Sequence, residues 1–330
     1  MLADDAFRAV VAESTRAPSV HNTQPVRWRR AGTGIALRLD PARRLPVGDP
    51  AGRDALVSLG AALEGAAIAL CRRGHEVGEP RFEADGAVLP VRPDGALPAA
   101  VAMAERLSAL MDERRTHRGP FRPARPATLD RLRTWAEGAG DVALQTDPPA
   151  VARLLALGDE AALAALRDRA YRRELLGWMR LSSRRPGAAR DGLAAAALGL
   201  GPLEARGARF VLGPLFASLD RLGLARRLLA ERGAARHLAG VAVLHRPDGE
   251  HPAETGRIWL RRLLALAEMG MQAWPLGVLT DTASARAAVA GEARVPTGRA
   301  VAGVFRVGLP APGTVPPRAR LPAEAVIDAG

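Results

Sequence analysis

Apolar and polar positions follow two different periods near the N-terminus of the chain. After an N-terminal helical segment, residues 26–29 and 35–39 alternate with the two-residue period of a strand, and glycines within 32–34 predict a turn between them. From 53 to 73 the large apolar residues recur every three or four positions, and Gly74 stands where a helix commonly ends. The pattern predicts a strand hairpin followed by a long helix.

That helical pattern also contains a run of small residues, namely Gly60, Ala61, Gly65 and Ala67. Small side chains allow another backbone to come close. We therefore expect a second helix to pack tightly along residues 53–73.

Similar patterns recur more loosely through the rest of the chain. The remaining helical patterns cover residues 99–114, 129–138, 151–179, 213–232 and 255–271. The remaining strand patterns cover 82–91, 142–145, 239–245 and 300–307. The long helices at 53–73 and 255–271 hold comparable places in the two halves, which indicates an internal duplication.

The composition is that of a folded, water-soluble protein. Hydrophobic residues make up 48% of the chain and charged residues 25%. We expect no membrane span, because no apolar run approaches roughly 18 to 20 residues, and no signal peptide, because Asp4 and Asp5 make the N-terminus acidic. Cytoplasmic localisation is therefore expected. Cys71 is the only cysteine and the histidines are scattered, so neither a disulfide within the chain nor a metal site is predicted.

The net charge of +12 suggests nucleic-acid binding as an alternative function. All 47 basic residues are arginine, however, and they are spread along the chain with few aromatic residues between them. We therefore expect no nucleic-acid partner.

The first candidate site is the segment 17–25, Ala-Pro-Ser-Val-His-Asn-Thr-Gln-Pro. It places a hydroxyl, an imidazole and two amides between two prolines, which suits a planar ligand with hydrogen-bonding edges. The alternative is a helix-to-strand turn capped by serine and asparagine.

Two further candidates are rich in arginine. Residues 114–118, Arg-Arg-Thr-His-Arg, offer three guanidinium groups and a hydroxyl, the groups that bind a phosphate monoester. Residues 317–322, Pro-Arg-Ala-Arg-Leu-Pro, could add further phosphate contacts. The alternatives are a solvated surface for the first and a fraying tail for the second.

Together these segments resemble the nitroreductase superfamily of flavoproteins. The first resembles its Pro-Ser-x-x-Asn-x-Gln-Pro flavin segment, the second its Arg-Arg-Ser-x-Arg segment with Thr116 in place of serine, and the third its C-terminal Pro-basic-x-Arg-Leu-Pro. Residues 274–277, Trp-Pro-Leu-Gly, resemble the loop near the reactive edge of the isoalloxazine. The chain departs from the family pattern at Val26, where a tryptophan is usual, and from the Acg-type branch at Gly277-Val278, where a polar pair is usual.

The order of the segments resembles the Acg-type branch of that superfamily. In ordinary nitroreductases the arginine segment comes first and the flavin lies between two identical subunits, whereas here Pro18 comes long before Arg114. The resemblance implies an α+β nitroreductase-like fold with mixed, mainly antiparallel sheets flanked by helices. Two fused halves, residues 1–98 and 99–330, would form a pseudo-dimer within a monomer or in a homodimer.

The resemblance also implies one FMN between the halves, with NAD(P)H as reductant and a nitroaromatic or quinone-like acceptor. The flavin would carry the chemistry, so no catalytic side chain is expected. The implied cofactor-binding residues are Pro18, Ser19, His21, Asn22, Gln24, Arg114, Arg115, Thr116, Arg118, Pro275, Leu276, Gly277, Arg318 and Arg320.

In the Acg-type branch a segment of the chain covers the flavin. The glycine-rich stretch 181–209 is the candidate lid here. A covered flavin leaves little room for NAD(P)H, so the alternative function is an FMN-sequestering or sensing protein without turnover.

Overall fold

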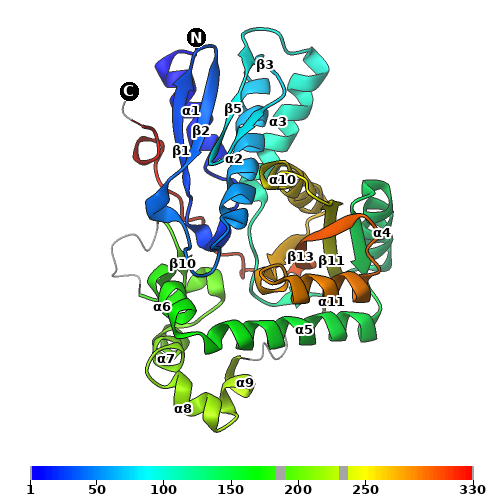
Figure 1. Cartoon of the computed structure of the whole chain (residues 1–330). Coiled ribbons are helices and arrows are strands. Elements are labelled where there is room, and N and C mark those ends of the chain that lie inside the picture. The colour runs from blue at the N-terminus through cyan, green and yellow to red at the C-terminus, as the bar shows by residue number, and fades with distance from the viewer. Residues whose placement is uncertain (1, 183–189, 230–236, 329–330) are drawn as a thin grey trace.

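The computed structural model describes residues 2–182, 190–229 and 237–328, and contains two large antiparallel sheets, each with its own helices, besides the two-stranded pairs β3–β6 and β9–β10 (Figure 1). The first sheet has the order β1-β2-β5-β4 and the second the order β12-β13-β11-β8, with β7 paired to β13. The only parallel pairing between strands of the described residues is the short pair β9–β10. This architecture confirms the expected α+β class with mainly antiparallel sheets.

The first sheet and its helices are built from the N-terminal part of the chain. Within it, Trp28 is paired with Leu37 and only 1% exposed, because alternate residues of the hairpin face the helices. The elements are α1 (Asp4–Ser14), η1 (Val20–Asn22), β1 (Val26–Ala31), β2 (Gly34–Leu39), η2 (Pro41–Arg43), α2 (Arg53–Cys71), β3 (Glu76–Val77), β4 (Arg81–Glu83), β5 (Gly86–Leu89), β6 (Val91–Arg92) and α3 (Pro98–Glu113).

The second sheet is buried on both faces. Successive residues of its central strand β11 (Gly240–Pro247) point to opposite sides, so that Ala242 packs in one core cluster and Val243 in another. The other elements are β7 (Phe121–Arg122), α4 (Pro126–Ala139), β8 (Val142–Gln145), α5 (Pro148–Arg167), α10 (Pro252–Glu268), β12 (Gln272–Pro275), η4 (Gly277–Leu279), α11 (Ala283–Ala293) and β13 (Arg299–Pro310).

Helices α2 and α10 join the two sheets at the centre of the molecule. A Cβ atom added to Gly60 would lie 1.8 Å from the carbonyl oxygen of Ala253, and one added to Gly256 would lie 2.0 Å from that of Val57. The expected close helix partner of residues 53–73 is thus confirmed as α10. Glu64 of α2 is buried and pairs with two arginines of α10 at 3.1 and 2.6 Å, which fixes the crossing further.

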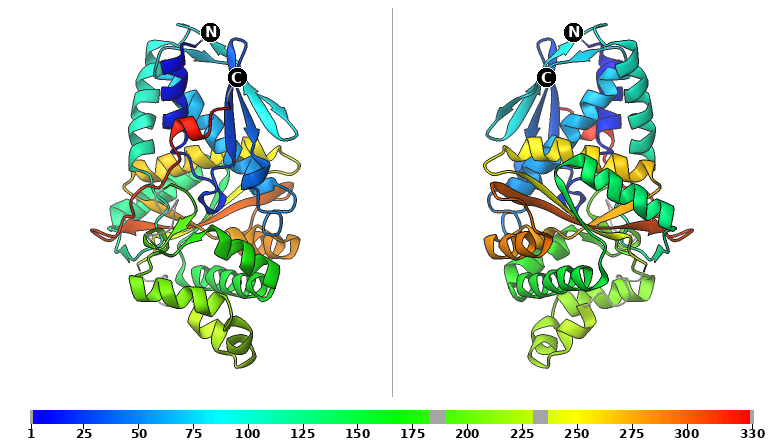
Figure 2. Two further views of the ribbon diagram at one scale, coloured as in Figure 1. Left: turned by 90° about the vertical axis from the view of Figure 1, so that its left-hand side faces the viewer. Right: turned by 90° about the vertical axis from the view of Figure 1, so that its right-hand side faces the viewer.

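The C-terminal end of the chain returns to the first sheet. The amide of Trp28 donates to the carbonyl of Val326 over 2.9 Å, and the amide of Asp328 donates to the carbonyl of Trp28 over 2.8 Å. Figure 2 shows this red segment, which includes η5 (Ala323–Ala325), passing beside the blue strands. Residues 311–328 therefore connect the second sheet back to the first.

A small helical extension with a core of its own lies below the second sheet in Figure 1. Its elements are α6 (Arg169–Trp178), β9 (Met179–Arg180), β10 (Leu193–Ala194), η3 (Ala196–Leu198), α7 (Pro202–Leu212), α8 (Phe216–Arg221) and α9 (Leu224–Leu229).

Several sequence expectations need correction. The single strand expected at 82–91 is the hairpin β4–β5 followed by β6, and the helix expected at 151–179 is interrupted at Asp168, whose side chain caps α6. The helix expected at 213–232 is the short pair α8 and α9, and residues 230–232 lie outside the described residues. The stretch 181–209 is less irregular than expected, because it contains β10, η3 and most of α7.

The sequence was expected to contain no apolar run long enough to span a membrane, and helix α2 shows that this expectation is wrong. By length and composition it is apolar enough to cross a membrane. Because 78% of its most apolar window is buried inside the protein, its apolar character matches its place as the core helix.

Candidate functional site

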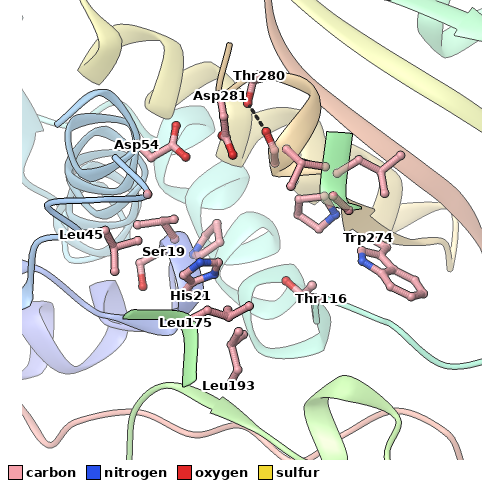
Figure 3. Close-up of a pocket in the computed structure, with 18 of the residues that line it drawn as sticks. Ser19, His21, Leu45, Asp54, Thr116, Leu175, Leu193, Trp274, Thr280 and Asp281 are labelled. Carbon is pink, nitrogen blue, oxygen red and sulfur yellow. Dashed lines mark hydrogen bonds between the residues drawn. The ribbon is translucent and has the colours of Figure 1, made fainter. Parts of the chain in front are cut away.

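A cavity of about 340 Å³ lies between the two sheets where the sequence candidates meet. Residues 18–21 line it from the first half, Thr116 and Arg118 from the segment after α3, and residues 274–277 from β12 and η4. Figure 3 shows Ser19, His21, Thr116 and Trp274 around this space. The structure thus places side by side three segments that are far apart in the sequence.

The backbone of the segment after α1 is held in an uncommon conformation. His21, Asn22 and Gln24 have φ values of 45°, 53° and 51°. Residues with side chains seldom adopt this left-handed region, and such strain is concentrated at functional sites. The hydroxyl of Ser19 accepts from the amide of Gln24 over 3.0 Å, and that of Ser58 on α2 accepts from the amide of Val20 over 3.0 Å. These two hydroxyls hold the backbone on either side of His21.

The two amide side chains of this segment bind protein backbone in the structure. Asn22 donates to the carbonyls of Gly192 and Ala319 over 3.2 and 3.3 Å. Gln24 donates to the carbonyl of Arg190 over 2.8 Å and accepts from the amide of Leu321 over 2.8 Å. Neither side chain belongs to the cavity wall formed by the described residues. Both join the first half to the candidate lid and to the C-terminal segment.

A cluster of arginines, of which Arg114 is buried and Arg318 and Arg320 are half-buried, lies beside this segment but outside the residues that line the cavity. Arg114, Arg318 and Arg320 each donate to the same carbonyl oxygen, that of Arg16, over 3.0, 3.0 and 3.1 Å. Within the part of the chain that the structure describes, none of the three forms an ion pair with a carboxylate, and the buried Nε atoms of Arg114 and Arg320 have no hydrogen-bond partner. Donors are therefore in excess at this point, as a site for an anion requires.

The pKa values of these arginines report the same imbalance. Burial and the mutual repulsion of the guanidinium groups lower the pKa of Arg318 to about 10 and that of Arg320 to about 9. The same two causes lower the pKa of Arg114, which is only 3% exposed. Arg115 is half-buried, and burial lowers its pKa as well, although Asp112 opposes the shift. A bound phosphate would relieve this repulsion.

The segment 116–118 is positioned by the second sheet. Thr116 forms a parallel bridge with Ala273 of β12, and the amide of His117 donates to the carbonyl of the same residue over 3.2 Å. On the other side of β12, the guanidinium of Arg306 lies 4.6 Å from the ring centre of Trp274. Strand β12 therefore carries both Trp274 and the turn 275–277 to the cavity wall.

The opposite wall contains residues that the sequence did not single out. Asp54 comes from the first turn of α2, Tyr171 and Leu175 from α6, and Asp281 from the turn after η4. Trp259 of α10 lines the cavity as well. Nothing in the sequence spacing marks these residues, because four separate elements bring them together.

Burial changes the protonation of the groups in the cavity. It lowers the pKa of His21 to about 4, with a smaller contribution from Arg118, so the imidazole is neutral at pH 7. Partial desolvation, followed by the nearby charges of Asp54 and Asp49, raises the pKa of Asp281 to about 7, although the residue as a whole is exposed. Burial also raises the pKa of Asp54, although the neighbouring Arg53 opposes this shift. The cavity thus contains one neutral imidazole and two carboxyl groups with raised pKa values.

Part of the candidate lid contributes to the cavity wall. Residues 183–189 of the stretch 181–209 lie outside the described residues. Leu193 of β10 lines the cavity, and the amide of Gly192 donates to the carbonyl of Asn22 over 3.1 Å. Gly192 has a φ of 70°, and an added Cβ would lie 2.3 Å from the carbonyl oxygen of Trp178. Only glycine fits this anchor point of the stretch.

The curated proteins that match the chain are all named as putative NAD(P)H nitroreductases. The curated proteins named "Putative NAD(P)H nitroreductase Rv3131" and "Putative NAD(P)H nitroreductase acg" of Mycobacterium tuberculosis are 31% identical over 193 residues and 38% identical over 82 residues. These matches cover 53% and 25% of this chain and 51% and 25% of the relatives. The chain is related to Acg-type nitroreductase-like proteins. The first of these matches spans about half the length of the relative.

The comparisons with protein-family models and with solved structures do not strengthen this relationship. No protein-family model matches the chain. Solved structures of NfnB nitroreductases from a sphigopyxis strain and from Mycobacterium smegmatis are both 21% identical to it, with TM-scores of 0.36 and 0.35. They cover 68% and 69% of the chain and 98% and 96% of their own lengths. The curated relatives alone thus confirm the resemblance noted in the sequence.

Proposed function

We propose that the chain binds one FMN in the cavity between its two halves. The observation that supports this most directly is the arginine cluster, in which buried donors without carboxylate partners lie beside a cavity with aromatic walls. Arg114, Arg115, Arg318 and Arg320 would hold the phosphate, and the hydroxyl of Thr116 would add a donor. The names of the NfnB structures describe FMN-dependent enzymes, and the relatives are named as nitroreductases.

The protein side chains would bind and orient the cofactor. A bound flavin supplies the chemistry of hydride transfer. Residues 275–277 would lie at its reactive edge, as the family resemblance implies. The neutral imidazole of His21 can donate or accept a hydrogen bond without adding a charge to the buried site. Asn22 and Gln24 would act mainly by fixing the backbone of residues 18–21.

We propose further that the holoprotein is an NAD(P)H-dependent oxidoreductase that reduces nitroaromatic or quinone-like acceptors. The cavity wall supports this assignment, because Tyr171, Trp259 and Trp274 provide aromatic surfaces for a planar acceptor. The protein would act in the cytoplasm, without nucleic-acid or membrane partners.

A second function, storage or sensing of FMN without turnover, is favoured by one observation. Tyr171, Leu175 and Leu193 of the helical extension line the cavity, so this part of the chain would lie over a bound flavin. A flavin covered in this way would exclude NAD(P)H.

An absorbance spectrum of the purified protein tests these proposals first. Bands near about 370 and 450 nm, the general signature of an oxidised flavin cofactor, together with release of FMN on heating, would support the site. Bleaching by NADPH under anaerobic conditions would then support the reductase, whereas a flavin that stays oxidised would favour storage. A colourless protein that does not take up added FMN would refute both.

A further inference from the structure

The cavity has opposite charges at its two ends. Arg118, two residues after Thr116, lines one end, whereas Asp54 and Asp281 line the other. Arg114, Arg115, Arg318 and Arg320 do not themselves line the cavity. Figure 3 shows these two carboxylates near each other on the wall facing His21. Asp159 of α5 also belongs to the cavity wall.

The carboxylates at the second end are only partly neutralised. Arg53 lies 3.3 Å from Asp54, but its other terminal nitrogen donates to the carbonyl of Ala302 over 3.0 Å. Arg286 lies close enough to affect Asp281 electrostatically, yet it donates to the carbonyl of Thr280 over 2.6 Å. Arg53 and Arg286 thus stand near a group of three carboxylates, Asp49, Asp54 and Asp281.

The third carboxylate of this group, Asp49, is occupied by the protein itself. It accepts from the amide of Ala55 over 2.9 Å and so stabilises the start of α2. Asp281, in contrast, has no hydrogen-bond or ion-pair partner among the described residues, although it lines the cavity. Its carboxylate is therefore available to a ligand.

The walls between the two ends are apolar and aromatic. Trp259, Trp274, Leu45, Leu166 and Tyr171 line the cavity, and Tyr171 lies close enough to Asp54 and Asp281 to feel their charges. Burial and the neighbouring carboxylates raise the pKa of Tyr171, so its hydroxyl stays protonated and can donate. A flat aromatic ring fits these walls, and a positive charge attached to it would meet both carboxylates and aromatic faces.

We propose that Asp54 and Asp281 determine which acceptors the cavity takes, favouring planar aromatic compounds with a positive charge and rejecting anionic ones. This inference rests on the proposed function, because it assigns the acidic end to the acceptor and the basic end to the phosphate of FMN. It goes further than that function by naming the charge class of the acceptor and the residues that select it.

The preference depends on pH. Partial desolvation and the charges of Asp54 and Asp49 raise the pKa of Asp281 to about 7, although the residue is exposed and Arg53 and Arg286 oppose the shift. This value lies within the physiological range. The carboxylate gains its charge as the pH rises from 6 to 8, so affinity for a cation increases over that interval. A neutral ligand of the same shape shows no such increase.

Three nitroaromatic probes of similar shape test the proposal: the cation 4-nitrobenzyltrimethylammonium, the anion 4-nitrobenzoate and the neutral 4-nitrobenzyl alcohol. Binding to the full chain is measured at pH 8 by quenching of tryptophan fluorescence, with and without added FMN. We expect the cation to bind at least about tenfold more tightly than the anion, as one favourable charge contact commonly gives. Equal affinities would overturn the proposal.

Asp281→Asn is the decisive variant, because Asp281 has no partner in the described structure whose loss would disturb folding. It should reduce the ratio of cation to anion affinity about tenfold and remove its rise with pH, while leaving the neutral alcohol unchanged. Asp54→Asn should act in the same direction. Asp130→Asn on α4, an exposed carboxylate that pairs with Arg133, serves as the control and should change nothing.

The two proposals can fail separately. FMN content is measured on each sample, so a chain that binds no flavin refutes the proposed function, whereas the charge preference is still read from the fluorescence of the flavin-free protein. An unchanged affinity ratio in Asp281→Asn refutes the selection by charge even where FMN binds fully.

Discussion

The arginines after α3 and near the C-terminus lower the stability of the folded chain. Burying like charges together without carboxylates is unfavourable, and the lowered pKa values of Arg114, Arg318 and Arg320 report that cost. An anionic ligand would offset it. At the residue scale, this cost is the strongest physical reason to expect a phosphate at the site.

Arg115→Ala provides the mildest test of the phosphate site, because this side chain is half-buried and donates to backbone carbonyls of its own turn. Loss of one charged hydrogen bond, about 1.5 to 3 kcal/mol, should weaken FMN binding roughly 10- to 100-fold. Riboflavin, which lacks the phosphate, should bind the variant and the wild type equally in a fluorescence titration. Arg131→Ala, an exposed arginine of α4, should leave both affinities unchanged. An equal loss for riboflavin would argue against the assignment.

His21 should make the protein sensitive to acid. Its folded pKa of about 4 lies below the usual value of 6.5, so the unfolded chain binds a proton first and stability falls as the pH drops from about 6.5 to 4. His21→Asn keeps a residue that tolerates the positive φ. Urea unfolding at pH 7 and pH 4.5 should show a smaller loss for this variant than for the wild type, by about 2 kcal/mol.

The control for this measurement is His237→Asn. His237 is exposed and also has a positive φ, of 62°, so it tests the same backbone change without burial. Its stability should follow the wild type at both pH values. Equal acid losses in His21→Asn and the wild type would contradict the role given to the buried imidazole.

At the scale of elements, helices α2 and α10 both contribute residues to the cavity wall and cross in close backbone contact. Gly256→Ala would place a Cβ 2.0 Å from the carbonyl of Val57, and backbone at this distance cannot yield cheaply. We expect a loss of at least about 3 kcal/mol in urea unfolding. Gly138→Ala in α4, where an added Cβ has no neighbour within 4 Å, should be neutral or slightly stabilising. Similar values for the two variants would show that the crossing is not tightly packed.

The sequence predicted those elements whose pattern is local. The long helix α2 and the hairpin β1–β2 carry a clear periodicity, whereas the buried strands β11 and β13 are recognised as continuous apolar runs. Strand β12 and helix α11 were missed, the first because it is short and the second because alanines leave its apolar face undefined.

For the candidate site, too, residues within local motifs could be predicted, whereas residues brought together only by the fold could not. The motif segments around His21 and Thr116 were found, and the structure places them on one cavity. The roles of Asn22 and Gln24 could not be predicted, because their partners lie in segments more than 160 residues away. Asp54 and Asp281 were missed because carboxylates at a helix start or in a turn are ordinary in sequence, and only packing brings them together.

At the scale of the whole molecule, the C-terminal segment closes the structure. Its backbone forms hydrogen bonds with Trp28 at the edge of the first sheet. The guanidinium of Arg320 donates to the side-chain oxygen of Asn22 over 2.7 Å and to the carbonyl of Arg16. The proposed phosphate site and the attachment of the C-terminal segment to the first sheet therefore depend on the same stretch of chain. Removal of this stretch should affect both together.

A chain ending at residue 316 should lose FMN binding and unfold at a lower temperature. In hydrogen exchange, the amide of Trp28, which donates to Val326, should exchange faster, whereas the central strand β11 should keep its protection. The double variant Arg318→Ala, Arg320→Ala separates the two effects. It should lose FMN but keep the protection of Trp28, because the strand-edge bonds are made by backbone atoms. Full FMN content in the shortened chain would mean that the phosphate is held elsewhere.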